Sequence, residues 1–408
     1  MAATVALAAA SCAKEADVDL ENLEQRSLDA WVQKYVNNNG TVARRLDNGM
    51  YVTVDNSRAD ASSVATADTV VWIKYDCTGY DLYKNVYLTR SETMARRQGT
   101  YTPYTHYVPT YAFCGLESTG MVEGLFYAFR NALPDASGNE VLLRKGSKAT
   151  LYLPSSLAYG SLGVSDEVGY GGQYSLDGNI PSVLEITIEE VIKDPEAYEK
   201  SCVDEYLATT ADNYELVVDS LEYLYFDRNF RLAEGDVYDG DSIKTDSTVY
   251  VWYVGKFLDG FVFDTNIDSV KTRLYGKVDE EGKAFSVTIS DHAEVVKGWL
   301  YSLQHLRKGQ WAKLLFTSEY GYGIDGRMAR KGSTSYTYYN PYLYNNAMSY
   351  MYNSGYMYGY YDYYNYYYND YYNSLYGNIQ QETDNSITTE IQSYTPLIFE
   401  IYIEGDDE

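Results

Sequence analysis

The chain has 408 residues, a formal net charge of −26 and only three histidines. A chain this acidic is repelled by nucleic-acid phosphates and by anionic membrane surfaces, so we expect no nucleic-acid partner. His106, His292 and His305 are far apart in the sequence and lack the spacing of metal ligands, which argues against a zinc site. The length is too great for one ordinary core, so two or more domains are expected.

The N-terminus carries a short run of small apolar residues, AATVALAAAS at positions 2–11, that ends at Cys12. This run is too short to span a bilayer and is typical of the end of a secretory signal. Its last part, LAAASC, resembles a relaxed lipobox, so residues 1–12 are predicted to be a signal end with lipidation at Cys12. We therefore expect a lipid-anchored protein of the cell envelope, in the periplasm or on the outer surface of a Gram-negative-type bacterium. Because no Lys or Arg precedes the run, a disordered Ala-rich tail with a chance cysteine is the alternative.

The other cysteines are Cys77, Cys114 and Cys202, an odd number that cannot pair completely. Export would favour a disulfide between Cys77 and Cys114. Buried free thiols remain an equal alternative.

A helix is predicted near the start of the chain, within residues 13–41. Residues 18–36 place an apolar stripe at helical spacing, and NNNG then ends the pattern. The stripe consists of Leu20, Leu23, Leu28, Trp31, Val32 and Tyr35. This helix is expected either to pack on the first domain or to bridge membrane and domain.

The chain contains an internal repeat. LRKGSKATLYLPSSLAYG at 143–160 aligns without a gap with LRKGQWAKLLFTSEYGYG at 306–323, at an offset of 306 − 143 = 163. VLEITIEE at 183–190 aligns with IFEIYIEG at 398–405, at an offset of 398 − 183 = 215. The second copy therefore carries 215 − 163 = 52 extra residues between the two matches.

Earlier pairs extend the repeat towards the N-terminus. MVEGL at 121–125 matches VVKGW at 295–299, and VVWIKY at 70–75 matches VYVWY at 249–253. These matches predict a first domain over 42–195, a helical linker over 196–221 and a second domain over 222–404, with an insertion at about 328–390 in the second.

Alternating β-branched and aromatic runs dominate both copies and predict strands. In the second copy they are TVYVWYV, FSVTI, AKLLF and PLIFEIYI. HAEVVKGWLYSLQHL, residues 292–306, has the spacing of a short helix. Each copy is thus predicted to be an antiparallel sheet wrapped on one short helix, an α+β fold.

The second copy resembles an FKBP-type peptidyl-prolyl isomerase domain. The resemblance is carried by VWYVGKFLDGFVFDTN (251–266), KAFSVTI (283–289), EVVKGWLYSLQHLRKGQWAKLLFTSEYGYG (294–323) and TPLIFEIYIEG (395–405). It implies an isomerase that assists protein folding and acts on proline-containing or unfolded chains. Such an enzyme is expected to need no cofactor or metal and to be a monomer.

The resemblance also implies an aromatic pocket for the proline ring, with Trp299 as its floor. Asp264 would be its one carboxylate and would orient Tyr253, the backbone N–H of Val296 would hold the substrate carbonyl, and Tyr322 would donate its hydroxyl. The remaining pocket residues are apolar and would form the walls and rim: Phe263, Phe285, Val295, Ile391 and Phe399.

The first copy matches the same template more weakly. Tyr87-Leu88 stands at the Phe-Asp position, Leu125 stands where Trp299 does, and Leu184 replaces the aromatic residue of the closing strand. Tyr159 and Ile180 match. Because the tryptophan and the carboxylate are both missing, we expect the first copy to bind peptides or to brace the second copy.

The insertion contains a tyrosine-rich stretch. Residues 336–376 hold 19 tyrosines among 41 residues. Tyrosine gives a large amphipathic contact surface at low entropy cost, so this stretch is predicted either to be a flap that holds unfolded chains or to be a low-complexity loop.

Three functions stay open for the whole chain: a membrane-tethered isomerase, a peptide-binding lipoprotein without turnover, and an adhesin or glycan-binding protein.

Overall fold

The computed structural model describes residues 20–68, 70–117, 121–164, 175–276, 281–290, 292–329 and 388–405. The predicted lipidation site Cys12 and the tyrosine-rich stretch at 336–376 lie outside the described residues. No helix within the described ranges is both long and apolar enough to cross a membrane.

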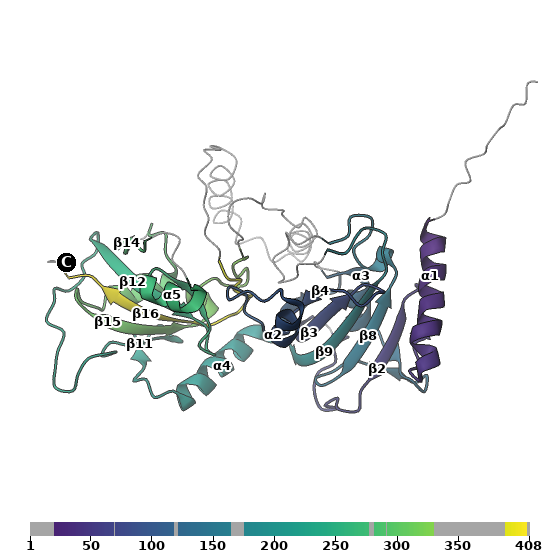
Figure 1. The fold of residues 1–408 in the computed structure, drawn as a ribbon. Helices are drawn as coiled ribbons and strands as arrows, with labels where there is room; N and C mark the ends of the chain where they lie inside the picture. Colours follow the sequence, from purple (N-terminus) through teal and green to yellow (C-terminus); the bar gives the residue numbers. More distant parts are fainter. Residues whose placement is uncertain are drawn as a thin grey trace, which may run out of the picture.

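The N-terminal unit, residues 20–192, is a seven-stranded antiparallel sheet with three helices (Figure 1). The strand order is β1-β2-β8-β9-β3-β4, with β5 paired to β3, and a separate hairpin joins β6 and β7. The helices are α1 (Leu20–Tyr35), α2 (Glu92–Gln98) and α3 (Glu123–Arg130), with short 3₁₀ turns η1 (Asn37–Asn39) and η2 (Ser155–Leu157). The strands are β1 (Arg44–Arg45), β2 (Tyr51–Asp55), β3 (Val71–Tyr80), β4 (Val86–Thr89), β5 (Thr110–Cys114), β6 (Leu133–Pro134), β7 (Glu140–Val141), β8 (Lys148–Leu153) and β9 (Ser182–Ile192).

The C-terminal unit, residues 195–405, repeats this plan. Its seven-stranded sheet has the order β10-β11-β15-β16-β12-β13, with β14 paired to β12. The strands are β10 (Glu215–Leu216), β11 (Leu224–Asp227), β12 (Thr248–Lys256), β13 (Val262–Thr265), β14 (Phe285–Thr288), β15 (Trp311–Phe316) and β16 (Leu397–Ile403). The helices are α4 (Pro195–Thr209), α5 (Asp268–Tyr275) and α6 (Lys297–Leu303), with the 3₁₀ turn η3 (Ser318–Tyr320). The predicted class, α+β with antiparallel sheets, is thereby confirmed.

Strand pairing corrects the sequence alignment of the two copies near Tyr75. Gly79 faces Leu88 and Leu184 in the first sheet, just as Gly255 faces Asp264 and Phe399 in the second. The offset at these strands is therefore 255 − 79 = 176 rather than 178. The residue that corresponds to Tyr253 is thus Cys77 and not Tyr75.

Three helix predictions need correction. One helix was expected between the strands of each copy, but each unit has a second one there: α2 in the first unit and α5 in the second. The predicted helix over 292–306 shrinks to Lys297–Leu303, and the predicted linker helix over 196–221 ends at Thr209 and is followed by strand β10. Both reasons are local. Helix α6 begins only at Lys297 because Val296 has an extended backbone. The linker does not continue as a helix because the two residues of β10 pair with β11.

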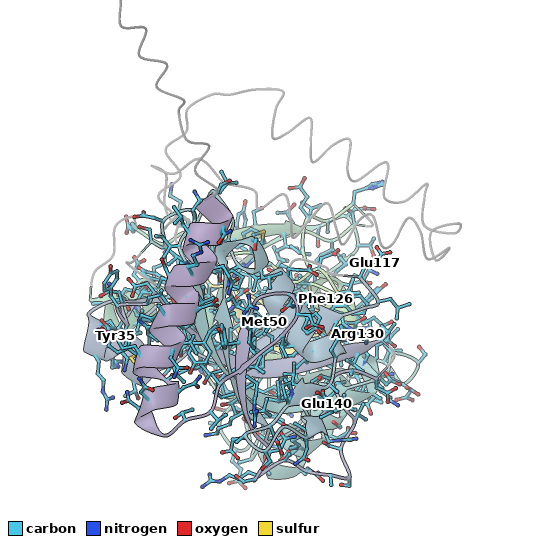
Figure 2. The ribbon with its side chains drawn as sticks, turned by 90° about the vertical axis from the view of Figure 1, so that its right-hand side faces the viewer. Tyr35, Met50, Glu117, Phe126, Arg130 and Glu140 are labelled. Atoms are coloured by element: carbon cyan, nitrogen blue, oxygen red, sulfur yellow. The ribbon has the colours of Figure 1, made fainter. Side chains whose placement is uncertain are left out.

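Helices α1 and α4 occupy equivalent places on the outer faces of the two sheets. Leu28 and Val32 of α1 pack with Tyr152 and Val183, and Val203 of α4 packs with the corresponding pair Leu315 and Ile398. In Figure 2, α1 (purple) runs across the front of the N-terminal unit. The repeat therefore includes the preceding helix: α1 belongs to the first unit, and α4 covers the second unit instead of serving only as a linker.

Both helices use a glutamate to cap the 3₁₀ turn that follows the equivalent strand. Glu24 accepts hydrogen bonds from the backbone N–H and the hydroxyl of Ser155, and Glu199 accepts the same pair from Ser318. A carboxylate is suited to this position because the first N–H groups of a helical turn lack partners within the turn.

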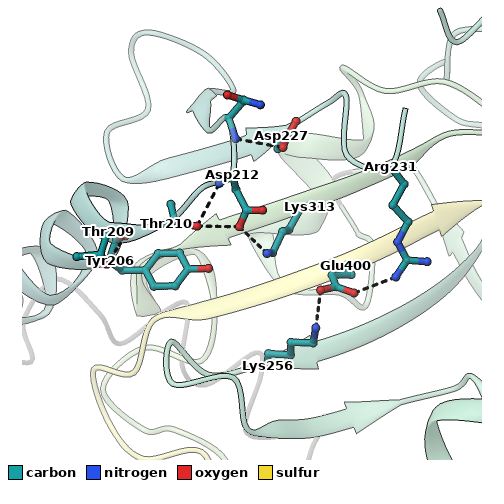
Figure 3. Close-up of polar contacts among 10 residues, drawn as sticks. Tyr206, Thr209, Thr210, Asp212, Asp227, Arg231, Lys256, Lys313 and Glu400 are labelled. Carbon is teal, nitrogen blue, oxygen red and sulfur yellow. Dashed lines mark hydrogen bonds and ion pairs between the residues drawn. The ribbon is translucent and has the colours of Figure 1, made fainter. Parts of the chain in front are cut away.

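Charged residues line the outer face of the C-terminal sheet next to α4 (Figure 3). Glu400 of β16 pairs with Lys256 and with Arg231, and Lys313 of β15 pairs with Asp212. The inner faces of the same strands are apolar, because successive side chains of a strand point to opposite sides. This alternation directs Tyr253 of β12 and Phe399 of β16 to the interior, where the candidate site forms.

The three cysteines of the described residues are free, and Cys77 and Cys114 are buried. The expected alternative of a Cys77–Cys114 disulfide is therefore not realised. Burial raises the pKa of the Cys77 thiol to about 12 and that of Cys114 to about 11. Both thiols consequently stay protonated and behave as small core residues.

Candidate active site

Two neighbouring strands direct aromatic rings into the interior of the C-terminal unit. Tyr253 lies on β12, on the same face as Val251 and Gly255, and Phe399 lies on the paired strand β16. Their ring centroids are 6.2 Å apart. The two-residue period of a strand explains why these rings share one face while Trp252 and Tyr402 lie on the other.

The hairpin from β12 to β13 brings Phe263 and Asp264 beside them. A Cβ atom at Gly255 would lie 2.7 Å from the Phe263 ring and 2.9 Å from the Phe399 ring. A glycine at this position therefore allows both rings to approach the backbone closely. The Phe263 and Phe399 rings meet edge to face with centroids 5.5 Å apart.

Trp299 forms the centre of the cluster. Its indole lies 5.2 Å from the rings of both Tyr253 and Phe399 and 6.1 Å from Phe285, all with near-perpendicular planes. Helix α6 carries it close to the sheet because Gly298 leaves room for the Phe316 ring, which a Cβ atom would meet at 2.5 Å. Trp299 is 4% exposed, and its indole N–H has no hydrogen-bond partner among the described residues.

The rim of the cluster is formed by Phe285, Val295 and Val296. Phe285 begins β14 and is 42% exposed, so it lies at the edge of the cluster and not in its wall. Val296 precedes α6 with an extended backbone, and its N–H donates to no residue that the structure describes. The predicted donor for a substrate carbonyl is therefore available at this position.

Tyr322 and Ile391 complete the predicted set from the segments that flank the insertion. Tyr322 follows the turn η3, and Ile391 forms an isolated antiparallel bridge with Arg327. Both pack against the same core as Trp299. The structure thus places all ten predicted pocket residues of the C-terminal unit around one aromatic cluster.

Arg327 is a site residue that the sequence analysis missed. Its guanidinium Nη1 lies 3.5 Å from Asp264 Oδ2 and 3.4 Å from Tyr322 Oη, and its Nη2 donates to the Thr389 carbonyl at 3.3 Å. The guanidinium also lies over the ring of Phe263, 5.6 Å from its centroid. The one sequence cue was its place five residues after Tyr322, which is no recognisable period of a helix or strand.

The electrostatics of the site keep its two phenols protonated. Burial is the largest cause that raises the pKa of Tyr253, and the neighbouring carboxylate of Asp264 raises it further through charge and a hydrogen bond. Burial likewise raises the pKa of Tyr322, although the Arg327 cation opposes the shift. Both hydroxyls therefore keep their protons near neutral pH and can donate hydrogen bonds, and the Asp264 carboxylate lies near enough to Tyr253 to raise its pKa.

The equivalent region of the N-terminal unit is apolar and filled. Cys77, Tyr87, Leu125 and Leu184 stand at the positions of Tyr253, Phe263, Trp299 and Phe399, and all four are buried in one core. The Tyr87 hydroxyl bonds to that of Ser182. The position of Asp264 is taken by Leu88, so this cluster has neither the indole nor the carboxylate.

No metal centre is evident in the described ranges, where no group of three or more His, Cys, Asp or Glu side chains could hold an ion. The aromatic cluster offers apolar surface, one carboxylate, one guanidinium and two phenol donors. Such a set binds and orients an uncharged group but contains no activated nucleophile.

Residues 240–342 match the profile of the FKBP-type peptidyl-prolyl cis-trans isomerase family. Over this segment the C-terminal unit is similar to FKBP-type isomerases. The matched segment includes Tyr253, Asp264, Trp299 and Tyr322, whereas Phe399 lies beyond it. The structure joins the two parts by pairing β16 with β12 and β15.

A probable FKBP-type peptidyl-prolyl cis-trans isomerase of Haemophilus influenzae is 33% identical to the chain over 87 residues. The match covers 21% of this chain and 30% of the relative, so the chain spans less than a third of that protein's length.

Similar solved structures include the three FKBP domains of wheat FKBP73, at 13% identity over 90% of this chain and 98% of that one, with a TM-score of 0.24. A peptidyl-prolyl cis-trans isomerase from Pseudomonas syringae is 16% identical over 52% of this chain and 92% of its own, with a TM-score of 0.27. FkpA from Escherichia coli is 14% identical over 42% and 62%, with a TM-score of 0.26. At these TM-scores the likenesses support no conclusion about this chain.

Proposed function

We propose that the C-terminal unit catalyses cis–trans isomerisation of X–Pro peptide bonds in polypeptide substrates. The observation that carries the proposal is the ring of aromatic side chains around the Trp299 indole with the Asp264 carboxylate at one side. The match of this segment to the FKBP-type family supports the same reaction.

The reaction requires little from the protein beyond such a cluster. Rotation about an X–Pro amide faces a barrier of about 18–20 kcal/mol because the amide is conjugated. At the top of the barrier the amide is twisted and its nitrogen has lost conjugation. A site that binds this form more tightly than the planar amide lowers the barrier, and about 1.4 kcal/mol gives a tenfold rate increase.

The described residues have distinct tasks in this proposal. The Trp299 indole receives the flat face of the proline ring, and Tyr253, Phe263 and Phe399 exclude water from the amide. The Val296 N–H and the Tyr322 hydroxyl donate hydrogen bonds to carbonyl groups on either side of the proline. Phe285 and Val295 bound the mouth of the site, and the buried Ile391 is part of its wall.

The N-terminal unit is proposed to be a second FKBP-like domain without catalytic activity. Its sheet order matches that of the C-terminal unit, and its interior lacks the indole and the carboxylate. Together the two units would form one tandem protein, in which each unit begins at its leading helix, α1 or α4, and not at residues 42 and 222 as predicted.

The cellular setting is also a proposal. The run before Cys12 supports export and lipid anchoring, with exported or envelope proteins as folding clients. The tyrosine-rich stretch at 336–376 enters the chain just after the site, which supports a role in holding unfolded substrate.

The test is a protease-coupled isomerisation assay with succinyl-Ala-Leu-Pro-Phe-p-nitroanilide and the full chain. Trp299→Leu, which installs the residue of the first unit, is expected to lower kcat/KM at least tenfold, and Asp264→Asn severalfold. Trp311→Leu is the matched control, because Trp311 packs on Tyr402 on the other face of the sheet. Wild-type activity in Trp299→Leu, with circular dichroism unchanged, would refute the proposal.

Peptide binding without turnover is the second candidate. It is favoured by the N-terminal unit, whose equivalent positions carry neither the indole nor the carboxylate. Calorimetry with the same peptide separates the two candidates: binding with no acceleration in the wild-type chain supports the binding module.

A further inference from the structure

A short segment of the C-terminal unit, residues 388–392, is held by the N-terminal unit. Glu390 forms an ion pair with Arg90 at 2.8 Å, and Gln392 accepts from the Tyr111 N–H at 2.6 Å. The Gln392 amide also donates to the Pro109 carbonyl at 3.1 Å. We name residues 388–392 the wall segment, because Ile391 within it is a wall of the candidate site.

The wall segment is linked directly to the site by Arg327. The N–H of Arg327 donates to the Ile391 carbonyl at 2.7 Å, and the N–H of Ile391 donates back at 2.8 Å. The Thr389 carbonyl accepts from the guanidinium that also approaches Asp264 and Tyr322. A displacement of the wall segment would therefore move both Ile391 and the guanidinium beside Asp264.

Chain connectivity restrains the wall segment closely on one side only, where four residues join Gln392 to Leu397 at the start of β16. The stretch between Arg327 and Ile391 contains 391 − 327 − 1 = 63 residues. A long connection restrains the relative position of its ends little, so on this side the bridge and the noncovalent contacts of the wall segment must fix it. Much of that support comes from the other unit: Thr389 donates its hydroxyl to the Tyr104 carbonyl at 2.7 Å, next to the Glu390 and Gln392 contacts.

The loop of the N-terminal unit that contains Tyr104 and His106 contacts two more elements near the site, helix α5 and the hairpin between β12 and β13. The Tyr104 ring stacks on Tyr275 at the end of α5, with centroids 4.1 Å apart. His106 stacks on Phe257 at 4.5 Å and bonds to Asp259 at 2.7 Å, at the tip of the hairpin that carries Phe263. Contacts on three separate elements around one end of the site indicate a fitted surface and not a chance touch between two domains.

We propose that the N-terminal unit is a positioning element for the site of the C-terminal unit, and that Arg90, Tyr104, Pro109 and Tyr111 act through the wall segment. The proposal deepens the proposed function and rests on it, since the wall that is positioned belongs to the peptide site. The N-terminal unit thereby acquires a role that needs neither an indole nor a carboxylate of its own: it sets the affinity of its neighbour for substrate.

The test uses the full chain with the double substitution Glu390→Gln and Gln392→Leu. Both side chains face the N-terminal unit, and neither is placed in the pocket. Glu215→Gln is the matched control, because it removes an ion pair with Arg228 at the β10 edge, away from the wall segment. Three quantities are measured: kcat and KM with succinyl-Ala-Leu-Pro-Phe-p-nitroanilide, its Kd by calorimetry, and hydrogen exchange of the Arg327 and Ile391 amides.

In the double variant we expect KM and Kd to rise about tenfold, within the usual range of coupling between sites, while kcat changes less than twofold. The Arg327 and Ile391 amides should exchange about tenfold faster, while the core amides of β12 and β16 keep the wild-type rate. The control should show neither change. A structural role alone would alter exchange or stability without raising KM.

Two results would overturn the inference: wild-type exchange at both bridge amides, or faster exchange with unchanged KM and Kd. Peptide binding by the wild-type chain without turnover would instead overturn only the proposed catalysis. In that case the change in Kd and in exchange still decides whether the N-terminal unit positions the site.

Discussion

At the residue scale, the candidate site depends on close approach between rings and backbone. Gly255 has no side chain at the point where Phe263 and Phe399 meet, and Gly79 leaves the same room for the Tyr87 ring in the first unit. Both glycines sit at an irregularity in the pairing of their strand with the next one. The repeated glycine therefore serves ring packing in both units, whether or not a carboxylate follows.

Gly255→Ala should destabilise the C-terminal unit by about 1–3 kcal/mol, because the added methyl group must displace the Phe263 or Phe399 ring. The measurement is the free energy of unfolding in urea. Gly405→Ala is the control, since no atom lies within 4 Å of its built Cβ. Equal stability of the two variants would mean that the rings move aside without cost.

At the element scale, each sheet has a helix on its outer face that is anchored by a glutamate. Burial raises the pKa of Glu199 to about 7, against the opposing effect of its two hydrogen bonds from Ser318. The folded chain thus takes up a proton at this carboxyl at a pH where the unfolded chain has released it. The helix–turn contact is consequently sensitive to pH near neutrality.

The contribution of protonated Glu199 to stability is complete below about pH 4.5 and is lost as the pH rises through about 7. Its loss amounts to about 3 kcal/mol at most, at roughly 1.4 kcal/mol for each unit of pKa shift. Urea unfolding at pH 5 and pH 8 should therefore show a smaller pH dependence for Glu199→Gln than for the wild type.

Glu205→Gln, on the same helix but exposed, is the control for this measurement. It should keep the wild-type pH dependence. If Glu199→Gln also keeps it, burial does not raise the pKa of Glu199, and the carboxyl is ionised in the folded chain at both pH values.

At the scale of the whole molecule, charge and the contact between the units dominate. The net charge of −26 opposes the compact state through self-repulsion. In most ion pairs of the described residues at least one side chain is about half exposed, and such pairs add little stability. Added salt should therefore weaken the net repulsion between charges more than it weakens the ion pairs, and so stabilise the folded chain.

We expect the melting temperature to rise by a few degrees between 10 and 200 mM NaCl, because the screening length falls from about 30 Å to below 10 Å over this range. Differential scanning calorimetry at constant pH measures the change. Sodium and potassium chloride should act alike. A lower melting temperature at high salt would show that ion pairs such as Arg90–Glu390 dominate instead.

The pocket residues of the second unit were predictable because they lie in short motifs that each fix one local geometry. DGFVFD places Phe263 and Asp264 on a hairpin, and the helix after VV places Trp299. Arg327 could not be predicted in the same way. It reaches Asp264 only because β13 and the segment after η3 meet in space, and no local pattern records that meeting.

The equivalence of α1 and α4 was missed for a related reason. Their sequences share few residues, and the match becomes visible once Glu24 and Glu199 are seen to bond to equivalent serines. Likewise the two-residue error at Tyr75 was resolved by strand register, since alternation alone tolerates a shift of two.

The sequence by itself determined the repeat, the strands and the aromatic set of the second unit, because hydrophobic period and local motifs depend on neighbouring residues. Only the tertiary structure decided that Arg327 joins this set, that Cys77 and Cys114 form no disulfide and that the first unit binds the wall segment. These are contacts between residues far apart in the chain, and packing of the whole molecule selects them.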